Sequence, residues 1–344
     1  MRRISGGFDV FTSMDTLEKA AEKACAARHD KSEVALFLSD KDRLLGVLRD
    51  SLVEQTFEPS PYRFFHVNEN GKDRLIGDSP LYPDRIKDWA LALAVESAID
   101  RRFVHHSYGS RKGKGVHLAV SDVFSDIRSD PRLQYAFIGD IRQCFASIPK
   151  EGIVSMLPTY LKDPGIIWAF ESSVMSYPLP GLVLGSRLSP LLCNMYLNRL
   201  DHLLRERHHA HYSYRYMDDY LVLGYSKPWL HRIGSVIESN LDELGLSLKP
   251  DRRVVPIRCG IPFLGSVIYR DHIMLRKRTK LKLQSQCRRM AAKLECGIPL
   301  DLYDRGVLAS YKGVLDHVSG RHLYSTTLGP VIAADAALCN EVRS

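Results

Sequence analysis

The chain lacks the features that mark membrane and secreted proteins. Among its 344 residues, no uninterrupted apolar stretch approaches the roughly 18 to 20 residues that cross a bilayer. Residues 1–15 include two arginines, but no apolar segment follows them, so the start does not resemble a secretory signal. We therefore expect a cytoplasmic protein with no membrane partner.

Cysteine pairs at the spacing of metal ligands are also absent. The seven cysteines are scattered, and no two form a Cys-x-x-Cys pair; they are Cys25, Cys144, Cys193, Cys259, Cys287, Cys296 and Cys339. This usage predicts reduced, mostly buried thiols and no zinc site. Internal repeats and low-complexity linkers are missing too, so we expect the parts of the chain to pack as one body.

Positive charge is concentrated rather than spread along the chain. The 48 Lys and Arg residues exceed the 40 Asp and Glu residues by eight. Between Arg270 and Lys293 there are nine basic residues and one acid, Asp271, so this segment alone carries a formal +8. A second basic cluster lies at 111–115 and contains Arg111, Lys112 and Lys114. Such clusters suit a phosphate backbone, although a solvated helix face would have the same composition.

Periodicity and turn residues predict a mixture of helices and strands. Helices are expected over 14–27, 39–53, from Asp84 as a cap through 86–94, over 191–204 and, as a basic helix, over 277–294. A hairpin is expected over 62–76, a buried strand over 135–139, and short strands over 212–224 and 254–269.

Acidic residues interrupt the strand-like segment 212–224. Asp218 and Asp219 adjoin each other there between apolar residues. Burying two neighbouring carboxylates costs several kcal/mol unless a cation or hydrogen bonds compensate. A type I′ turn between two strands would also explain their position without any function.

Asp140 repeats this pattern, because it is a single acid at the end of the apolar run 135–139. If the two strand ends are neighbours in one sheet, three carboxylates converge. Mg²⁺ takes oxygen ligands of this kind, often together with substrate phosphates. Two such ions about 3.5 to 4 Å apart stabilise the attacking and leaving oxygens of an in-line phosphoryl transfer. With the basic clusters, these acids favour nucleotide polymerisation.

Ordered blocks around these acids resemble reverse transcriptases of the bacterial, group II intron-like kind. The blocks are Lys72-Asp73-Arg74-Leu75-Ile76, Asp84-Arg85-Ile86 through Ser107-Tyr108-Gly109-Ser110-Arg111, Asp140-Ile141-Arg142-Gln143-Cys144-Phe145, Leu184-Gly185-Ser186-Arg187-Leu188-Ser189-Pro190, Tyr216-Met217-Asp218-Asp219, Gly245-Leu246-Ser247-Leu248-Lys249 and Phe263-Leu264-Gly265. The resemblance implies an α+β right-hand polymerase with an antiparallel palm sheet packed on helices. It also implies an N-terminal helical extension at 1–59, fingers at 60–125, a palm at 126–268 and a helical thumb at 269–344.

The resemblance assigns a role to each block. Asp140, Asp218 and Asp219 would be catalytic and, with Ile141, would hold two Mg²⁺ ions, for which Mn²⁺ substitutes. Residues expected to bind the nucleotide are Lys72, Arg74, Phe145, Leu184, Gly185 and Lys249. Phe145 falls on the steric-gate position, where its ring excludes a ribose 2′-hydroxyl, although core packing would also explain it. Residues expected to bind nucleic acid are Arg111, Lys112, Lys114, Ser189, Tyr216, Met217, Phe263, Leu264, Gly265, Arg276, Lys277, Arg278 and Lys280.

The implied activity is RNA-directed DNA synthesis on a structured RNA template from a DNA or RNA primer and deoxynucleoside triphosphates. An accessory protein or a second copy of the chain is an expected partner. About 75 residues follow Ile268, which is room for a compact thumb but not for an endonuclease extension.

Three settings share these motifs. Leu184, where most relatives have Gln, is typical of diversity-generating retroelements, which copy RNA with errors at adenines. Ser189-Pro190 departs from that group, which has Ser-Gln, and leaves open a phage-defence enzyme that copies a dedicated non-coding RNA. A catalytically silent RNA-binding scaffold is the alternative from another class.

Overall fold

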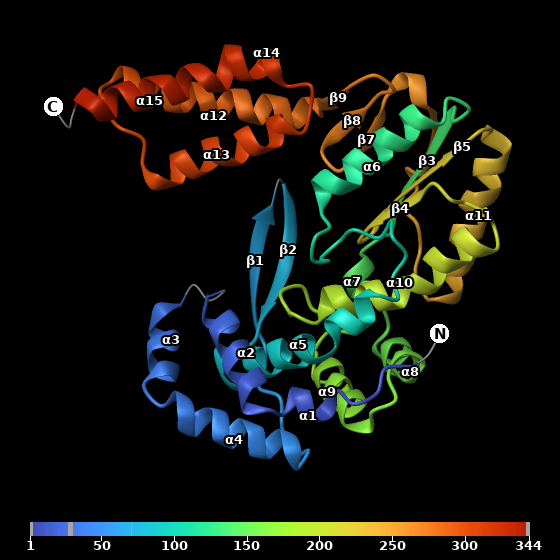
Figure 1. Ribbon diagram of the computed structural model, residues 1–344, viewed down its shortest axis with the longest axis vertical. Coiled ribbons are helices and arrows are strands. Elements are labelled where there is room, and N and C mark those ends of the chain that lie inside the picture. The colour runs from blue at the N-terminus through green and yellow to red at the C-terminus, as the bar shows by residue number, and fades with distance from the viewer. Residues whose placement is uncertain (1–2, 27–29, 70, 342–344) are drawn as a thin grey trace. The chain divides into compact units, whose positions relative to one another are not determined.

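Figure 1 shows the computed structural model of the chain, which describes residues 3–26, 30–69 and 71–341. These residues form helices and three sheets of two, four and three strands. The paired strands β1–β2, β3–β6, β7–β8 and β8–β9 are antiparallel. The predicted α+β class is confirmed. Two compact units make up the fold, and each is described by itself: residues 1–113, 139–220 and 233–252, and residues 114–138, 221–232 and 253–344.

The first unit is built around helix α5 (Ile86–Asp100). This helix packs against α1 (Phe8–Phe11), α2 (Met14–Ala26), the short kinked segment η1 (Leu81–Arg85) and α9 (Pro164–Met175). Buried residues occupy most sides of α5: Ile86, Lys87, Asp88, Ala90, Leu91, Ala92, Val95 and Ile99. A helix with so little polar surface belongs in the middle of a core, where helices contact it from several directions.

Other elements surround this core. The remaining helices that lie wholly in the first unit are α3 (Lys31–Leu38), α4 (Lys41–Val53), α7 (Cys144–Ser147), α8 (Lys150–Tyr160) and α10 (Ser189–Glu206). Strand β4 spans Ser213–Tyr216, and the hairpin strands are β1 (Arg63–Glu69) and β2 (Lys72–Asp78). In the hairpin turn, Asn68 Oδ1 accepts a hydrogen bond of 3.0 Å from the Gly71 amide, as expected of an Asn that opens a turn.

The four-stranded sheet has the order β4-β5-β3-β6, with β3 at Tyr135–Asp140, β5 at Asp219–Gly224 and β6 at Arg253–Pro256. The boundary between the two units passes along the chain within β3 and β5, after Ile138 and Tyr220. Helix α11 (Lys227–Glu243) also contributes residues to both units.

The second unit contains helix α6 (Val116–Ser129), the three-stranded sheet and the C-terminal helices. The sheet is formed by β7 (Ile261–Phe263), β8 (Ser266–Ile268) and β9 (Ile273–Leu275), after the 3₁₀ turn η2 (Ile257–Cys259). The helices are α12 (Lys277–Glu295), α13 (Leu302–Asp316), α14 (Arg321–Leu323), η3 (Tyr324–Leu328) and α15 (Gly329–Glu341).

The C-terminal helices have their own apolar core and a buried ion cluster. Leu283, Cys287, Met290 and Leu294 recur at helical spacing along α12 and face the other helices of this core. The carboxylate of Asp304 on α13 is fully buried and contacts two cations of α12, Arg289 Nη2 at 2.5 Å and Lys293 Nζ at 2.6 Å. Two of the basic residues of α12 therefore stabilise the packing of α13.

Most predicted helices and strands are present. One prediction about a helix start and one about cysteine burial need correction. The predicted helices 39–53, 191–204 and 277–294 appear as α4, α10 and α12, within a few residues. The prediction that Asp84 caps a helix is wrong: α5 begins at Ile86, and Asp84 Oδ1 instead accepts from the Ser60 amide at 3.1 Å.

The second correction concerns the cysteines. All seven are free, as predicted, but "mostly buried" is wrong because only Cys144, Cys193 and Cys287 are buried. The sulfur atoms of Cys144 and Cys193 lie 3.7 Å apart.

Candidate active site

Strands β4 and β5 are joined by a tight turn that carries the acidic pair. Met217 and Asp218 connect Tyr216 to Asp219. Met217 has a φ of 51°, a left-handed conformation that is uncommon for a residue other than glycine. Asp218, also described, has no positive φ, whereas a type I′ turn needs positive φ at both central residues. The alternative explanation by a simple type I′ turn is therefore wrong.

Asp140 lies beside this turn because β3 and β5 are neighbours that run in opposite directions. At one end of the strand pair the Gln134 amide donates to the Gly224 carbonyl at 3.1 Å, and at the other the Ile141 amide donates to the Asp218 carbonyl at 3.0 Å. The structure therefore brings Asp140 together with Asp218 and Asp219, which are far from it in the sequence.

Lys249 reaches the same place from the loop after α11. Its amide donates to the Asp140 carbonyl at 2.8 Å, and its ammonium lies 2.5 Å from Asp140 Oδ1. Partial burial lowers the pKa of the Lys249 ammonium, but the hydrogen bond to Asp140 and the charges of all three aspartates raise it by more, so the net shift is upward. The ammonium of Lys249 therefore interacts electrostatically with all three carboxylates.

The donor set fits a divalent cation. Three carboxylates supply only oxygen ligands, which are those that Mg²⁺ prefers, and one of them already accepts a cation in the form of the Lys249 ammonium. These oxygen atoms are therefore chemically suited to hold a divalent ion.

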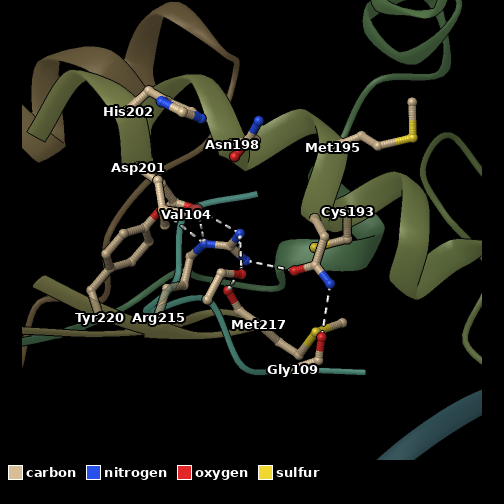
Figure 2. A network of polar contacts seen from close by, with 12 residues as sticks. Val104, Gly109, Cys193, Met195, Asn198, Asp201, His202, Arg215, Met217 and Tyr220 are labelled. Atoms are coloured by element: carbon tan, nitrogen blue, oxygen red, sulfur yellow. Dashed lines mark hydrogen bonds and ion pairs between the residues drawn. The ribbon is translucent and has the colours of Figure 1, made fainter. Parts of the chain in front are cut away.

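A buried polar network lies beside the turn, next to Met217 (Figure 2). Arg215 of β4 pairs with Asp201 of α10 at 2.7 Å, and both side chains are shielded from solvent. A third polar residue, Asn194 of α10, hydrogen-bonds to Arg215 and to the Gly109 carbonyl. Sequence reasoning missed all three. The available signal was polar side chains at positions of α10 and β4 that otherwise face the core.

The predicted steric-gate residue and the 184–185 block are joined by main-chain contacts. Phe145 is half-buried in α7, and its carbonyl accepts from the Leu182 amide at 2.8 Å. Two residues later, the Leu184 carbonyl accepts from the Gly77 amide of β2 at 2.7 Å. At Gly185, where φ is +105°, a Cβ would lie 2.3 Å from the Gly77 carbonyl oxygen. The segment from Leu182 to Gly185 therefore connects the hairpin to α7.

The two residues of the hairpin that are predicted to bind the nucleotide are Lys72 and Arg74, both on β2. Arg74 is exposed on β2 and lies opposite Val67 in the register of the hairpin. The side chain of Lys72 lies outside the described part of the structure.

The basic cluster at 111–115 does not act as one exposed patch. The guanidinium of Arg111 is 7% exposed, pairs with Asp100 at 2.5 Å, and donates to the carbonyls of Val104 and Ser107. This side chain stabilises the loop before it, and its predicted contact with nucleic acid stays a prediction. Lys112 is exposed, and Lys114 is half-buried in the second unit.

The other residues expected to bind nucleic acid divide between the two units. In the first unit Ser189 is fully buried at the start of α10, whereas Tyr216 is half-buried and Met217 is buried at the acidic turn. In the second unit Phe263 is buried, and Leu264 and Gly265 form the turn between β7 and β8 with positive φ values of 44° and 82°. Arg276, Lys277, Arg278 and Lys280 are exposed at the start of α12.

Comparison with known proteins covers the centre of the chain. Residues 69–268 match the family described as "Reverse transcriptase (RNA-dependent DNA polymerase)". An uncharacterized 91 kDa protein in the cob intron of Schizosaccharomyces pombe is 27% identical over 45% of this chain and 20% of its own length. Protein YkfC of Escherichia coli is 27% identical over 48% of this chain and 46% of its own length. The group II intron-encoded protein LtrA of Lactococcus lactis is 26% identical over 44% of this chain and 26% of its own length.

The chain thus spans less than half of the length of these relatives. Among solved structures, apo telomerase from Candida tropicalis aligns with a TM-score of 0.49 and 11% identity, over 67% of this chain and 49% of that one. In the described part of the chain, no helix has both the length and the apolar character needed to cross a membrane.

Proposed function

The chain belongs to the reverse transcriptase family, and from that premise we propose that it is an RNA-directed DNA polymerase. It copies an RNA template into complementary DNA by adding deoxynucleotides to a DNA or RNA primer. The fold, with its helices and antiparallel sheets, is consistent with the right-hand polymerase expected from the sequence. The observation that supports the proposal is that Asp140 lies beside the turn of Asp218 and Asp219, since the Ile141 amide donates to the Asp218 carbonyl at 3.0 Å and the Lys249 ammonium lies 2.5 Å from Asp140 Oδ1.

We propose that Asp140, Asp218, Asp219 and the carbonyl of Ile141 hold two Mg²⁺ ions, which Mn²⁺ can replace. When bound, these ions lower the pKa of the primer 3′-hydroxyl and neutralise charge on the leaving pyrophosphate. The net upward shift of the Lys249 pKa favours its charged form, which can hold a phosphate oxygen.

The nucleotide would lie between the hairpin and α7. Arg74 and Lys72 of β2 would bind the triphosphate, and an arginine there can form two parallel hydrogen bonds to it. The Phe145 ring would close the space that a ribose 2′-hydroxyl needs. Leu184 and Gly185 would face the nascent base pair and offer no side-chain hydrogen bond there.

The biological setting of this activity is a separate part of the proposal. Leu184 favours a diversity-generating retroelement enzyme, which works with a structured RNA and an accessory protein or a second copy of the chain. Ser189-Pro190 departs from that group, which leaves open a phage-defence enzyme that copies its own non-coding RNA. Sequencing the RNA that copurifies with the protein would separate these settings, because a variable-gene template supports the first and a single dedicated non-coding RNA the second.

A primer-extension assay tests the activity. The parent, with a defined RNA template, a DNA primer, deoxynucleotides and Mg²⁺, is expected to extend the primer. Asp218→Asn with Asp219→Asn should lower the rate by about a thousandfold or more, since several kcal/mol of charge stabilisation are lost. The matched control is the adjacent exposed pair Asp242→Asn with Glu243→Gln, which should keep the parental rate. A folded parent that extends no primer would support the RNA-binding scaffold instead.

A further inference from the structure

Arg215 is a charged residue with no access to water, since it is 1% exposed. Its Nε donates to both carboxylate oxygens of Asp201 at 2.9 Å, and Nη2 donates to Asp201 Oδ2 at 2.7 Å and to Ser107 Oγ at 3.1 Å. Its Nη1 donates to Asn194 Oδ1 at 2.8 Å and to the Met217 carbonyl at 3.2 Å. Every N–H group of the guanidinium therefore has an acceptor, which a lysine with three donors on a flexible stem could not reproduce.

Asp201 anchors both strands that flank the acidic turn. From β4 it receives the guanidinium of Arg215, and from β5 it receives the hydroxyl of Tyr220 at 3.2 Å from Oδ1. Burial and the charge of Asp201 raise the pKa of the Tyr220 hydroxyl well above its usual value, so it remains a donor. Residues 216–219 therefore lie between Arg215 and Tyr220, whose side chains both donate to the carboxylate of Asp201 on α10 (Figure 2).

The backbone of the turn is held as well. Met217 has its left-handed φ of 51°, and its carbonyl is the one that accepts from Arg215. On the other side of the turn, a Cβ at Gly109 would lie 2.4 Å from the Met217 sulfur and 2.8 Å from its amide nitrogen. Asn194 Nδ2 fixes Gly109 by donating to its carbonyl at 2.8 Å. The segment at Gly109 and the network therefore confine the turn from two sides.

We propose that Arg215 is a positioning residue for the divalent-cation site: through the Met217 carbonyl and Asp201, it holds the turn in the conformation that aims Asp218 and Asp219 at the metal. The proposal rests on the function proposed above. No hydrogen bond or ion pair found for Arg215 involves either of those two carboxylates. Asp201 balances the charge of Arg215. We therefore expect Arg215 to affect the cation site through the geometry of the turn and not through its charge.

The competing explanation is that this ion pair only stabilises the core. Removing one partner alone would leave a buried charge unpaired and could unfold the protein. The test variant is therefore Arg215→Gln with Asp201→Asn, which removes both charges. Tyr220→Phe is a milder second variant, because it deletes only the hydroxyl that ties β5 to Asp201, and Arg215→Lys is the conservative one.

The matched control is another buried ion pair of the same unit. Lys87 and Asp88 of α5 lie 3.1 Å apart with side chains 3% and 5% exposed. Lys87→Met with Asp88→Asn removes a buried pair of similar burial, and no contact found for it involves the acidic turn.

Two readouts separate positioning from stability. The first is Mn²⁺ binding to the full-length protein, followed by electron paramagnetic resonance of the free ion and normalised to the folded fraction. The second is primer extension as a function of Mg²⁺, with kcat and the nucleotide KM determined separately. The Arg215→Gln/Asp201→Asn variant should bind Mn²⁺ about 10- to 100-fold more weakly, as is typical when the support of metal ligands is lost.

The same variant should need correspondingly more Mg²⁺ and lose kcat with little change in the nucleotide KM. Tyr220→Phe should weaken Mn²⁺ binding by about threefold, and Arg215→Lys should fold but not restore parental affinity. The Lys87→Met/Asp88→Asn control should stay within about twofold of the parent.

The outcomes are distinct. Parental Mn²⁺ affinity in the folded Arg215 variants, or an equal loss in the Lys87 control, would overturn the proposal and leave a stability role. A parent that binds Mn²⁺ but extends no primer contradicts the proposed function, while the comparison of Mn²⁺ affinities still decides the role of Arg215. A parent that binds no Mn²⁺ contradicts both.

Discussion

Phe145 and Leu184 each lie on backbone that other contacts hold in place. Phe145 follows Gln143, whose positive φ of 45° turns the chain from the acid-bearing strand into α7. Leu184 is half-buried, and its main chain bonds to Gly77. Each side chain is thus carried by a backbone that is fixed independently of it. Substituting either side chain should change selectivity before it changes folding.

Phe145→Ala is expected to admit ribonucleotides, because the space taken by the ring becomes open to a 2′-hydroxyl. The ratio of kcat/KM for a ribonucleotide to that for the matching deoxynucleotide should rise about tenfold or more. Single-nucleotide incorporation with both sugars measures it. Phe124→Ala, on α6, is the control and should keep the parental ratio. An unchanged sugar ratio in the Phe145 variant would refute the gate role.

Leu184→Gln is expected to change the pattern of misincorporation, because an amide would stand where the side chain now offers no hydrogen bond. Sequencing of products made on an RNA template measures errors at adenines against those at other bases. Leu184→Met keeps the apolar character and should keep the parental error spectrum. If Gln and Met variants share that spectrum, Leu184 has no part in fidelity.

At the scale of elements, long regular segments were predictable and their tertiary contacts were not. The helical spacing of apolar residues in α10 and the run of basic residues in α12 can be seen in a short stretch of sequence. The positions of both helices were therefore predictable. Arg215 receives its partners from Ser107, Asn194 and Asp201, which only the folded chain brings together. Arg111 shows the same limit, because its pairing with Asp100 hides a charge that looks available in the sequence.

The ion cluster between α12 and α13 should make the packing of the C-terminal helices sensitive to acid. Lys293 lowers the pKa of the Asp304 carboxyl by hydrogen bonding, burial opposes this, and Arg289 lowers it further. A lowered folded-state pKa gives stability that is present above the unfolded value of about 3.9 and is lost as the pH falls through the folded value.

Asp304→Asn should therefore lower the melting temperature at neutral pH by about 5 °C and flatten its decline below pH 4. Thermal melts followed by circular dichroism across this range provide the measurement. Asp316→Asn, an exposed acid on the same helix, serves as the control. Equal acid sensitivity in parent and Asp304→Asn would show that the cluster does not govern this packing.

At the scale of the whole molecule, part of the basic segment 270–293 also serves the fold. Of its nine basic residues, Arg289 and Lys293 bind Asp304, and Arg270 donates to the carbonyls of Ile127 and Leu133. The predicted division into extension, fingers, palm and thumb remains a prediction, and the nucleic-acid role of α12 can be tested through salt dependence.

Replacing Lys277, Arg278 and Lys280 by Gln should weaken binding to a template–primer duplex and make it less dependent on salt. If each contacts one phosphate, the slope of log affinity against log salt should fall in magnitude by about two to three. Fluorescence anisotropy at several salt concentrations gives the slope. Lys19→Gln, Lys23→Gln and Lys31→Gln together remove the same charge from exposed positions of the first unit. An equal slope change in both triple variants would argue for a diffuse charge effect.

The main-chain bonds of Leu182 to Phe145 and of Leu184 to Gly77 make one short segment the common support of Phe145 and Leu184. With the roles proposed above for these two side chains, a shift of that segment would move both, and choice of sugar and choice of base would change together. Selection for a more accurate copy would carry sugar discrimination along with it, and a double-mutant cycle on Phe145 and Leu184 should be non-additive.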